Sequence, residues 1–336
     1  EYPMVDFVCR GEGEEAMPAL IEKLAACQFD VAAASAAFDL QEIRGIAWRA
    51  GDGAICIGHD VTVADIDTIP FAYRAEEMEP IKERILYYET TRGCPFSCAY
   101  CLSCATAGVR YLPLERVFRE LDFFVAHDVR QVKFVDRTFN AKTAHFLPIL
   151  KYLRALPDSC RTNFHFEVAI DYLDEEVLTV LGGLPRGRVQ LEIGIQSTNE
   201  QTLAAVSRVN HWSDIQSHIR RIMGFHNMHL HVDLIIGLPG EGMDSFHQSF
   251  NDVYALQTDM LQLGFLKFLK GAAMMELAAA GEYQYMDTAP YEVLSNRWLS
   301  YAEIRWLHSF EMVFGYYYNA GRCRRTLAYL IREAAQ

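Results

Sequence analysis

From residue 84 onward, the hydrophobic and polar positions follow two alternating periods, one typical of strands and one of helices. The helical period is clear where apolar residues recur every three or four positions, in Leu114, Val117, Phe118, Leu121, Phe124 and Val125, and again in Ile215, Ile219, Ile222 and Met223. The segments between such helices predict strands at 84–89, 131–135, 163–170, 189–196, 229–236 and 261–269. Strands that alternate with helices predict an α/β fold with a parallel sheet and outer helices. Six such units predict a partial (β/α)6 TIM-like barrel over residues 84–269, since a closed barrel has eight.

Several of these strands carry polar side chains on one face. The fourth strand alternates Val189, Leu191, Ile193 and Ile195 with Gln190, Glu192, Gly194 and Gln196, and the third and fifth strands place Glu167 and Asp233 among similar polar sets. Successive side chains point to opposite faces, and the helices must cover the apolar face. The polar face should therefore line the barrel and hold a ligand. The alternative is a buried polar network with a structural role, whose members must all be partnered. His229 and His231 share this strand face as a possible metal pair, although such residues are more often core histidines.

The two ends of the chain have other patterns. Residues 1–37 predict a strand, a turn and a helix, and the glutamates at the turn argue against a dinucleotide site. Residues 38–83 predict a connector with a hairpin at Ala50-Gly51-Asp52-Gly53, because Gly and Asp tolerate positive φ. Residues 270–336 are rich in aromatic side chains, and we expect helices at 290–310 and 322–335 that cover the open edge or bottom of the barrel.

Composition narrows the class of protein. The formal net charge of −13 disfavours a nucleic-acid partner, because phosphate contacts need clustered Lys and Arg. No apolar run is long enough for a membrane helix, and the start shows no signal peptide, so we expect a cytoplasmic protein without a membrane partner. Because Glu1 is not a natural start residue, we expect a piece of a longer chain.

The candidate chemistry lies in one loop. Three of the nine cysteines (Cys94, Cys98 and Cys101) are spaced Cys-x3-Cys-x2-Cys directly after the first predicted barrel strand. Three thiolates can hold three irons of a cubic iron–sulfur cluster and leave the fourth iron open for chemistry. A zinc site would prefer a second cysteine pair, and disulfides are rare in cytosolic enzymes. Cys104 could supply a fourth thiolate, which would make the site a closed electron carrier or structural cluster.

This loop, read as Thr91-Arg92-Gly93-Cys94-Pro95-Phe96-Ser97-Cys98-Ala99-Tyr100-Cys101, resembles the signature of the radical S-adenosylmethionine (radical SAM) superfamily. The resemblance implies a [4Fe–4S] cluster on the three cysteines, whose open iron binds S-adenosylmethionine and cleaves it to a 5′-deoxyadenosyl radical. It further implies that Asp136, Glu167, Glu192, Gln196 and Gly237 bind the cofactor, the last in the glycine-rich Gly237-Leu238-Pro239-Gly240-Glu241 segment beside the adenine. Asp136 and Arg137 stand where the family has a Gly-Gly-Glu-like segment, so they could also simply pair with each other.

The order of segments is closest to the cobalamin-dependent subclass of that superfamily. Residues 1–37 resemble the last βα unit of its Rossmann-like cobalamin domain, but the Asp-x-His-x-x-Gly motif of that domain is absent, so most of the cobalamin site should be missing. The subclass implies methylation of an unactivated carbon in the full-length protein and a reducing partner such as flavodoxin or ferredoxin. Methylthiolation, ring contraction or epimerisation is the rival chemistry, and the sequence leaves the substrate, peptide or small molecule, open.

Overall fold

The computed structural model describes residues 4–37, 40, 43–50, 52–105 and 108–334. The chain divides into two compact units, a small unit of residues 1–71 and a large unit of residues 72–336. No helix among the described residues is long and apolar enough to cross a membrane.

The small unit is a three-stranded antiparallel sheet with helix α1 (Gly13–Ala26) packed on it and helix α2 (Val31–Ala37) beside α1. It contains strands β1 (Phe7–Cys9), β2 (Ile46–Arg49) and β3 (Ile55–Ile57). β2 and β3 form the predicted hairpin, with Trp48 opposite Cys56, and β1 pairs with the other edge of β2. A core that includes Leu20, Ile46 and Trp48 joins α1 to the sheet, so the predicted βα segment and the hairpin share one core.

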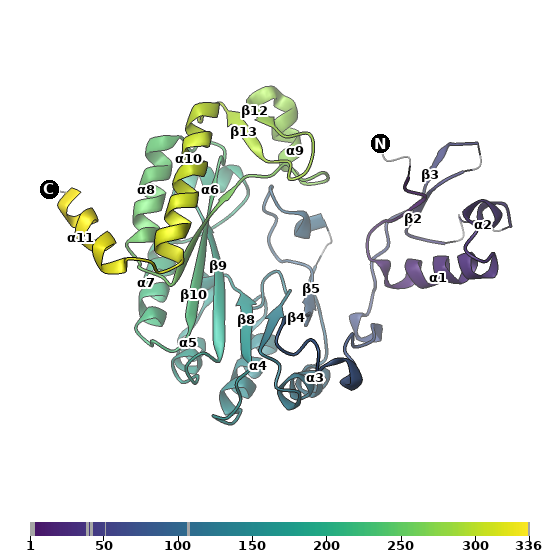
Figure 1. The fold of residues 1–336 in the computed structure, drawn as a ribbon, viewed down its shortest axis with the longest axis horizontal. Coiled ribbons are helices and arrows are strands. Elements are labelled where there is room, and N and C mark those ends of the chain that lie inside the picture. The colour runs from purple at the N-terminus through teal and green to yellow at the C-terminus, as the bar shows by residue number, and fades with distance from the viewer. Residues whose placement is uncertain (1–3, 38–39, 41–42, 51, 106–107, 335–336) are drawn as a thin grey trace. The chain divides into compact units, whose positions relative to one another are not determined.

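The large unit is built on the predicted parallel sheet (Figure 1). Its strands are β4 (Ile85–Tyr88), β7 (Gln131–Phe134), β8 (Asn163–Glu167), β9 (Val189–Gln196), β10 (His229–Ile236) and β11 (Met260–Phe265). They lie in the order β11-β10-β9-β8-β7-β4 and are all parallel, so each strand lies beside its sequence neighbours. The predicted α/β class and partial (β/α)6 barrel are confirmed.

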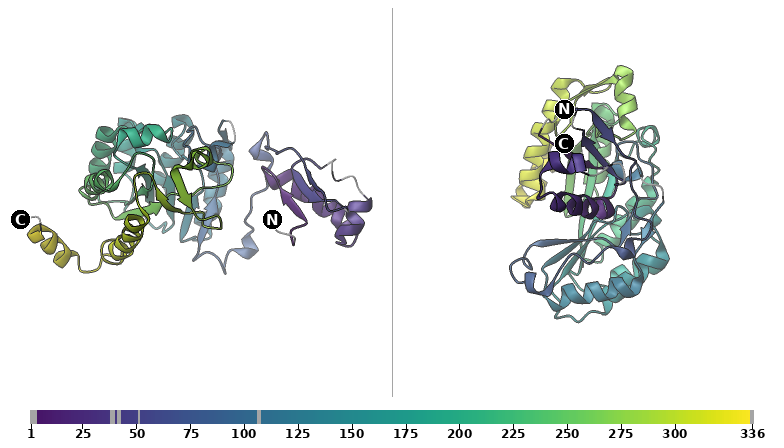
Figure 2. Two further views of the ribbon diagram at one scale, coloured as in Figure 1. Left: turned by 90° about the horizontal axis from the view of Figure 1, so that it is seen from above. Right: turned by 90° about the vertical axis from the view of Figure 1, so that its right-hand side faces the viewer.

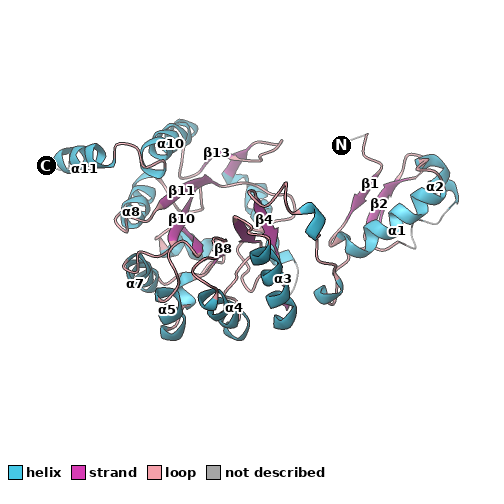
Figure 3. Ribbon diagram, turned by 60° about the horizontal axis from the view of Figure 1, so that its bottom comes forward, coloured by secondary structure: helices cyan, strands magenta, loops and turns pink. Residues whose placement is uncertain are grey.

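Helices cover the outer, apolar face of this sheet (Figure 3). They are α3 (Leu114–Ala126), α4 (Thr143–Ala155), α5 (Glu175–Gly182), α6 (Glu200–Ala205), α7 (Trp212–Met223) and α8 (Met243–Tyr254). The helical periodicity settles which side faces the sheet, because Val117, Leu121 and Phe124 of α3 are fully buried. In β9, the alternation of buried Val189 to Ile195 with partly exposed Gln190 to Gln196 confirms that the polar face points inward.

The C-terminal segment differs from the prediction. A hairpin of β12 (Tyr283–Tyr285) and β13 (Val293–Asn296) follows α9 (Met274–Leu277) and the π-helix η6 (Ala278–Glu282). The helix predicted at 290–310 therefore begins only at Tyr301, in α10 (Tyr301–Phe314), because Ser300 and Glu303 form a capping box that starts it there. After the π-helix η7 (Gly315–Asn319), the helix α11 (Arg324–Ala334) projects from the end of the barrel (Figure 2).

The end of this segment also closes one edge of the sheet. β11 is an edge strand, and the side chain of Asn319 donates to the carbonyl of Leu261 (2.9 Å) and accepts from its N–H (3.0 Å). An unpaired strand edge is a site for unwanted pairing, so an asparagine that mimics a neighbouring strand protects it.

Candidate functional site

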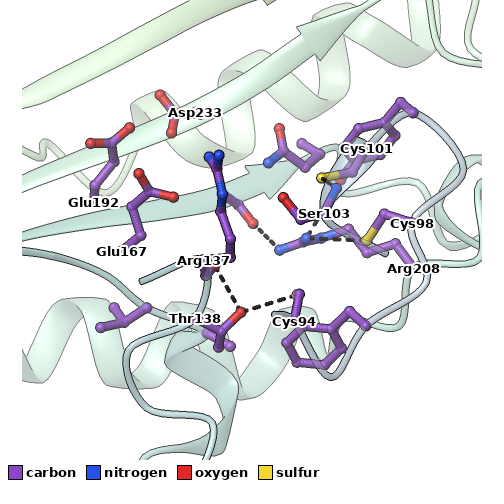
Figure 4. Close-up of a pocket in the computed structure, with 16 residues that line it drawn as sticks. Cys94, Cys98, Cys101, Ser103, Arg137, Thr138, Glu167, Glu192, Arg208 and Asp233 are labelled. Carbon is purple, nitrogen blue, oxygen red and sulfur yellow. Dashed lines mark hydrogen bonds between the residues drawn. The ribbon is translucent and has the colours of Figure 1, made fainter. Parts of the chain in front are cut away.

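A cavity of about 200 Å³ lies where the barrel strands end, and the three cysteines form one of its walls (Figure 4). Residues from strands β8, β9 and β10, from the segments that follow β7 and α6, and from the cysteine loop surround it. The charged and polar side chains among them are Cys94, Cys98, Cys101, Ser103, Arg137, Thr138, Glu167, Glu192, Gln196, Arg208 and Asp233. The carboxyl ends of parallel strands are where α/β barrels place their sites, so the position agrees with the fold.

The cysteine loop is held by backbone interactions at both ends. β5 (Thr91–Arg92) and β6 (Arg110–Tyr111) pair as a short ladder at its base, and the 3-10 helix η4 (Leu102–Ala105) follows the third cysteine. Gly93 has φ +107°, and a Cβ there would lie 2.2 Å from the carbonyl oxygen of Gly108, so only glycine fits. In the middle of the loop, the Ala99 N–H donates to Val206 (2.9 Å), and its carbonyl accepts from Met274 (2.8 Å).

Polar groups contact each cysteine sulfur. Thr138 Oγ1 lies 3.5 Å from Cys94 Sγ, and the Ser103 N–H donates to Cys101 Sγ over 3.4 Å. The guanidinium of Arg208 donates to Cys98 Sγ over 3.7 Å. The side chain of Cys104 lies outside the part of the chain that the structure describes, so the closed-cluster alternative has no structural test here.

Arg208 is a candidate functional residue that sequence reasoning missed. It lies after α6, and its guanidinium donates to the hydroxyl of Tyr100 (3.4 Å) and to the carbonyl of Gly194 as well as to Cys98. Burial lowers the pKa of this guanidinium, but the nearby Tyr100 and Cys98 outweigh that effect and raise it above its usual value. Its Nε also donates to Asn210 Oδ1 (3.1 Å), so four of the five N–H groups have partners, and one N–H of Nη2 together with the positive charge remains for a carboxylate. Arg208 lies twelve residues beyond the end of β9 and belongs to no recognisable motif, so only the fold reveals that it reaches the cysteine loop.

The structure does not bring Asp136 to the cavity. Its carboxylate has no exposed surface and accepts hydrogen bonds from the N–H groups of Thr90 (2.7 Å) and Thr91 (3.0 Å) and from the Thr90 hydroxyl. Burial raises the pKa of Asp136 to about 7, and these hydrogen bonds oppose the rise. The expected contact with S-adenosylmethionine is therefore corrected: Asp136 fastens the base of the cysteine loop to the end of β7. Nor does it pair with Arg137, which lines the cavity.

Glu167 and Glu192 line the cavity as predicted, together with Asp233 (Figure 4). The Lys133 ammonium lies 2.9 Å from Glu192 and 4.0 Å from Glu167, and His165 Nε2 lies 3.0 Å from Glu192. The hydrogen bond from His165, aided by Lys133, lowers the pKa of Glu192 to about 2 although burial opposes it. Burial and the charge of Glu192 raise the pKa of Glu167. Two neighbouring carboxyl groups thus have different affinities for protons.

The proposed histidine pair separates in the structure. His229 is exposed at the start of β10, whereas His231 is buried with Nε2 2.9 Å from Asp233. Glu192, His231 and Asp233 do come together closely enough to hold an ion. However, the Lys133 ammonium already neutralises the negative charge of Glu192, so this carboxylate has a cation without a metal ion. Glu192 is thus held by a neighbouring cation, whereas the Asp233 carboxylate lines the cavity.

Gln196 and Gly237, the two remaining sequence candidates, have different positions. Gln196 ends β9 with φ +70° and lines the cavity, where its buried Oε1 has no hydrogen-bond partner among the described residues. Gly237 lies outside the cavity wall. It has φ +94°, and a Cβ there would be 2.9 Å from Cγ1 of Val293 in β13. The glycine is therefore required by its backbone angle and by the β12–β13 hairpin, and the adenine contact expected from the sequence has no support in this geometry.

The residues present fit a [4Fe–4S] cluster with a bound amino acid group. Three cysteine thiols, the ligand type that iron–sulfur clusters need, share one wall of the cavity with hydrogen-bond donors at their sulfurs. The buried Gln196 Oε1, which has no hydrogen-bond partner among the described residues, offers an acceptor for an ammonium, and Arg208 offers its positive charge and one N–H for a carboxylate.

Comparisons with known proteins agree with this site. Residues 88–253 match the sequence model of the radical SAM superfamily, and residues 281–336 match that of a family described as "Protein of unknown function (DUF4080)". The cobalamin-dependent radical SAM methyltransferase TokK of Streptomyces tokunonensis is 25% identical over 275 residues, which cover 75% of this chain and 38% of TokK. The 2-(S-pantetheinyl)-carbapenam-3-carboxylate methyltransferase of Streptantibioticus cattleyicolor is 26% identical over 275 residues, 75% of this chain and 37% of that protein. The chain thus spans less than two-fifths of the length of these relatives.

Solved structures share the fold at lower identity. The radical S-adenosylmethionine methyltransferase TsrM of Kitasatospora setae superposes with a TM-score of 0.65 at 16% identity, over 84% of this chain and 55% of TsrM. The cobalamin-dependent S-adenosylmethionine radical enzyme OxsB gives a TM-score of 0.55 at 18% identity, over 80% of this chain and 38% of OxsB. At these identities, both comparisons show a shared fold.

Proposed function

The chain belongs to the radical SAM superfamily through residues 88–253, and from this premise we propose that it cleaves S-adenosylmethionine reductively at a [4Fe–4S] cluster. The superfamily uses the cluster and S-adenosylmethionine as its cofactors. When bound, they supply one-electron cleavage of the sulfonium to methionine and a 5′-deoxyadenosyl radical. An external reductant, such as flavodoxin or ferredoxin, would deliver the electron.

The protein's own residues would hold and orient these groups. Cys94, Cys98 and Cys101 would bind three of the four irons, and the fourth would stay open to the cavity. Arg208 would pair with the carboxylate of S-adenosylmethionine, and Gln196 Oε1 would accept from its ammonium. The carboxyl groups of Glu167 and Asp233 line the same cavity and would accept from ribose hydroxyls. Glu192, held by Lys133 and His165, would fix this wall in place.

One observation carries the proposal: the three cysteines and the half-buried guanidinium of Arg208 meet in one cavity at the ends of the parallel strands. Separate parts of the chain supply these groups, and the fold brings them together. A closed structural cluster would need no charged fork beside it and no cavity lined by three further carboxyl groups.

For the full-length protein we propose cobalamin-dependent methylation of an unactivated carbon. Two relatives that cover three-quarters of this chain are methyltransferases, one of them described as cobalamin-dependent. The small unit would then be the final part of a cobalamin domain. Because the chain has no Asp-x-His-x-x-Gly motif, we expect this chain by itself to cleave S-adenosylmethionine without transferring a methyl group.

The test is anaerobic reconstitution with iron and sulfide, followed by reduction, addition of S-adenosylmethionine and chromatography for 5′-deoxyadenosine. The wild-type protein should produce it, and Cys98→Ala should not, because one of three ligands is lost. The matched control is Cys160→Ala, which removes a cysteine far along the chain from the loop and should leave the product unchanged. A wild-type protein that binds the cluster and S-adenosylmethionine but makes no 5′-deoxyadenosine would contradict the proposal.

A further inference from the structure

The polar groups at the three cysteine sulfurs come from three different elements (Figure 4). Thr138 follows β7 and lies 3.5 Å from Cys94, Ser103 belongs to η4 and donates to Cys101, and Arg208 follows α6 and donates to Cys98. The contacts of Thr138 and Arg208 come from outside the cysteine loop. The barrel therefore provides hydrogen bonds to the sulfurs that the motif itself does not encode.

We propose that these donors raise the reduction potential of the cluster that the cysteines hold, and that Thr138 is a tuning residue for Cys94. This inference rests on the proposed function. Reduction adds one electron to the cluster, and its charge spreads onto the sulfurs. A hydrogen bond to a sulfur stabilises the reduced form more than the oxidised form, which makes the potential less negative.

The hydroxyl proton of Thr138 has two possible acceptors. Oγ1 donates to the carbonyl oxygen of Arg137 at 2.8 Å and lies 3.5 Å from Cys94 Sγ. When Cys94 is a thiol, its S–H can donate to Oγ1 while the Thr138 proton stays on the Arg137 carbonyl. A cysteine bound to iron has lost that proton, so only Thr138 can donate between these two atoms. The hydroxyl then needs only a rotation about its Cβ–Oγ1 bond, with no movement of heavy atoms.

The segment that carries Thr138 is firmly placed. Before it, Asp136 accepts three hydrogen bonds from Thr90 and Thr91 at the base of the cysteine loop. After it, the Phe139 N–H donates to the Glu167 carbonyl (2.8 Å), and the Asn140 side chain exchanges two hydrogen bonds with the backbone of Ala169. Thr138 is itself buried. The hydroxyl is thus fixed relative to both the loop and the barrel, as a tuning contact requires.

Among the three donors, Thr138 allows the clearest test. The Ser103 donor is a backbone N–H that side-chain substitution leaves in place. Arg208 also contacts Tyr100 and Gly194, so its replacement would change the wall of the cavity. Thr138→Val removes the hydroxyl at nearly constant shape, and Thr138→Ser restores a hydroxyl.

The experiment reconstitutes wild type, Thr138→Val and Thr138→Ser, checks iron and sulfide content, and measures the midpoint potential by an electron paramagnetic resonance titration without S-adenosylmethionine. We expect full clusters in all three, a more negative potential in Thr138→Val and a return towards wild type in Thr138→Ser. A fully loaded Thr138→Val protein with the wild-type potential would overturn the inference and leave the proposed function standing. A wild-type protein that takes up no cluster would instead overturn the proposed function.

Loss of iron from Thr138→Val could also come from a steric clash, because a methyl group of valine would replace Oγ1 next to Cys94 Sγ. Thr138→Ala, which has no atom at that position, is titrated in that case. A potential that is unchanged from wild type in the alanine variant also overturns the inference, and a more negative potential supports it.

Discussion

At the scale of single residues, neighbours in sequence have opposite functions. Asp136 and Arg137 follow β7 directly, yet Asp136 is fully buried at the base of the cysteine loop and Arg137 is exposed and lines the cavity. Alternation of side chains at a strand end accounts for this separation. The sequence analysis expected Asp136 to contact the cofactor, whereas Arg137 is the residue that lines the cavity, because the strand ends only where the tertiary contacts stop.

The buried Asp136 predicts a pH dependence of stability. Its pKa is raised to about 7 by burial, while the unfolded chain has an ordinary value near 4. Between these values the native state binds the extra proton, so the stability of the cluster-free protein should fall as pH rises through this window and level off above it. Asp136→Asn cannot titrate, so its free energy of unfolding, relative to that of wild type, should rise by about 1–3 kcal/mol between pH 5 and pH 8.

Denaturant unfolding of the cluster-free proteins at several pH values checks this prediction. The exposed Asp158→Asn is the control, because its curve should run parallel to that of wild type. A constant gap between Asp136→Asn and wild type over this pH range would show that Asp136 does not titrate there.

Arg208 predicts a change in cofactor affinity. Arg208→Lys keeps a positive charge but loses the planar fork that reaches both Cys98 and Gly194. Loss of one charged hydrogen bond costs about 1.5–3 kcal/mol, so we expect S-adenosylmethionine to bind roughly 10- to 100-fold more weakly to the loaded variant. Equilibrium dialysis measures the affinity, with the exposed Arg220→Lys on α7 as the control. Equal affinity in Arg208→Lys and wild type would remove Arg208 from the cofactor contacts.

At the scale of elements, Gly237 shows how a motif can have a packing cause. Gly237→Ala would place a Cβ 2.9 Å from Val293 at a backbone angle of φ +94°, so we expect a loss of about 1–3 kcal/mol in unfolding free energy. Gly187→Ala is a matched control, because Gly187 has φ +77° but open space around its Cβ position. The loss of unfolding free energy in Gly187→Ala should therefore come from the backbone angle alone.

Denaturant unfolding of both glycine variants separates the two costs. The alanine at 237 should destabilise the protein more than the alanine at 187. Equal losses would mean that the contact with β13 is unimportant and that the backbone angle alone requires glycine.

The edge of the sheet gives a second prediction at this scale. Asn319→Ala removes two hydrogen bonds to the backbone of Leu261 and leaves both backbone groups without that partner, so we expect a loss of about 1–3 kcal/mol. Asn319→Asp keeps the acceptor and loses the donor, and its loss should be intermediate. Thermal or denaturant unfolding measures both. A variant with full wild-type stability would show that water satisfies Leu261 equally well.

At the scale of the whole molecule, every residue of the candidate site lies in the large unit. Residues 72–336 produced without the small unit should therefore take up the same amount of iron as the full chain. Iron and sulfide analysis of both proteins after reconstitution checks this. Failure of the shortened chain to fold or load would mean that the small unit supports the site.

The small unit raises a separate question about cobalamin. Because the chain has no Asp-x-His-x-x-Gly motif, we expect no cobalamin to remain with the protein after gel filtration, as measured by its visible absorbance. Tight binding would mean that the described residues suffice for a corrin site and would contradict our reading of residues 1–37.

The sequence by itself determined the class of fold and predicted the cysteine ligands. Apolar periodicity is a local property, so the six parallel strands and the buried, sheet-facing sides of α3 and α7 followed from it. The spacing of Cys94, Cys98 and Cys101 is local too, and it predicted the three cysteines that line one cavity in the structure. The inward polar face of β9, with Glu192 and Gln196, also followed from a local alternation.

Only the tertiary structure decided which other residues complete the site. Arg208 reaches Cys98 across 110 positions of sequence, and Thr138 reaches Cys94 across 44, so no local pattern could reveal either contact. Asp136 and Gly237 looked like cofactor residues because their chemistry fits, yet the fold uses them for the loop base and for the β13 contact. The chemistry of a side chain is fixed by sequence, whereas its partners depend on long-range packing.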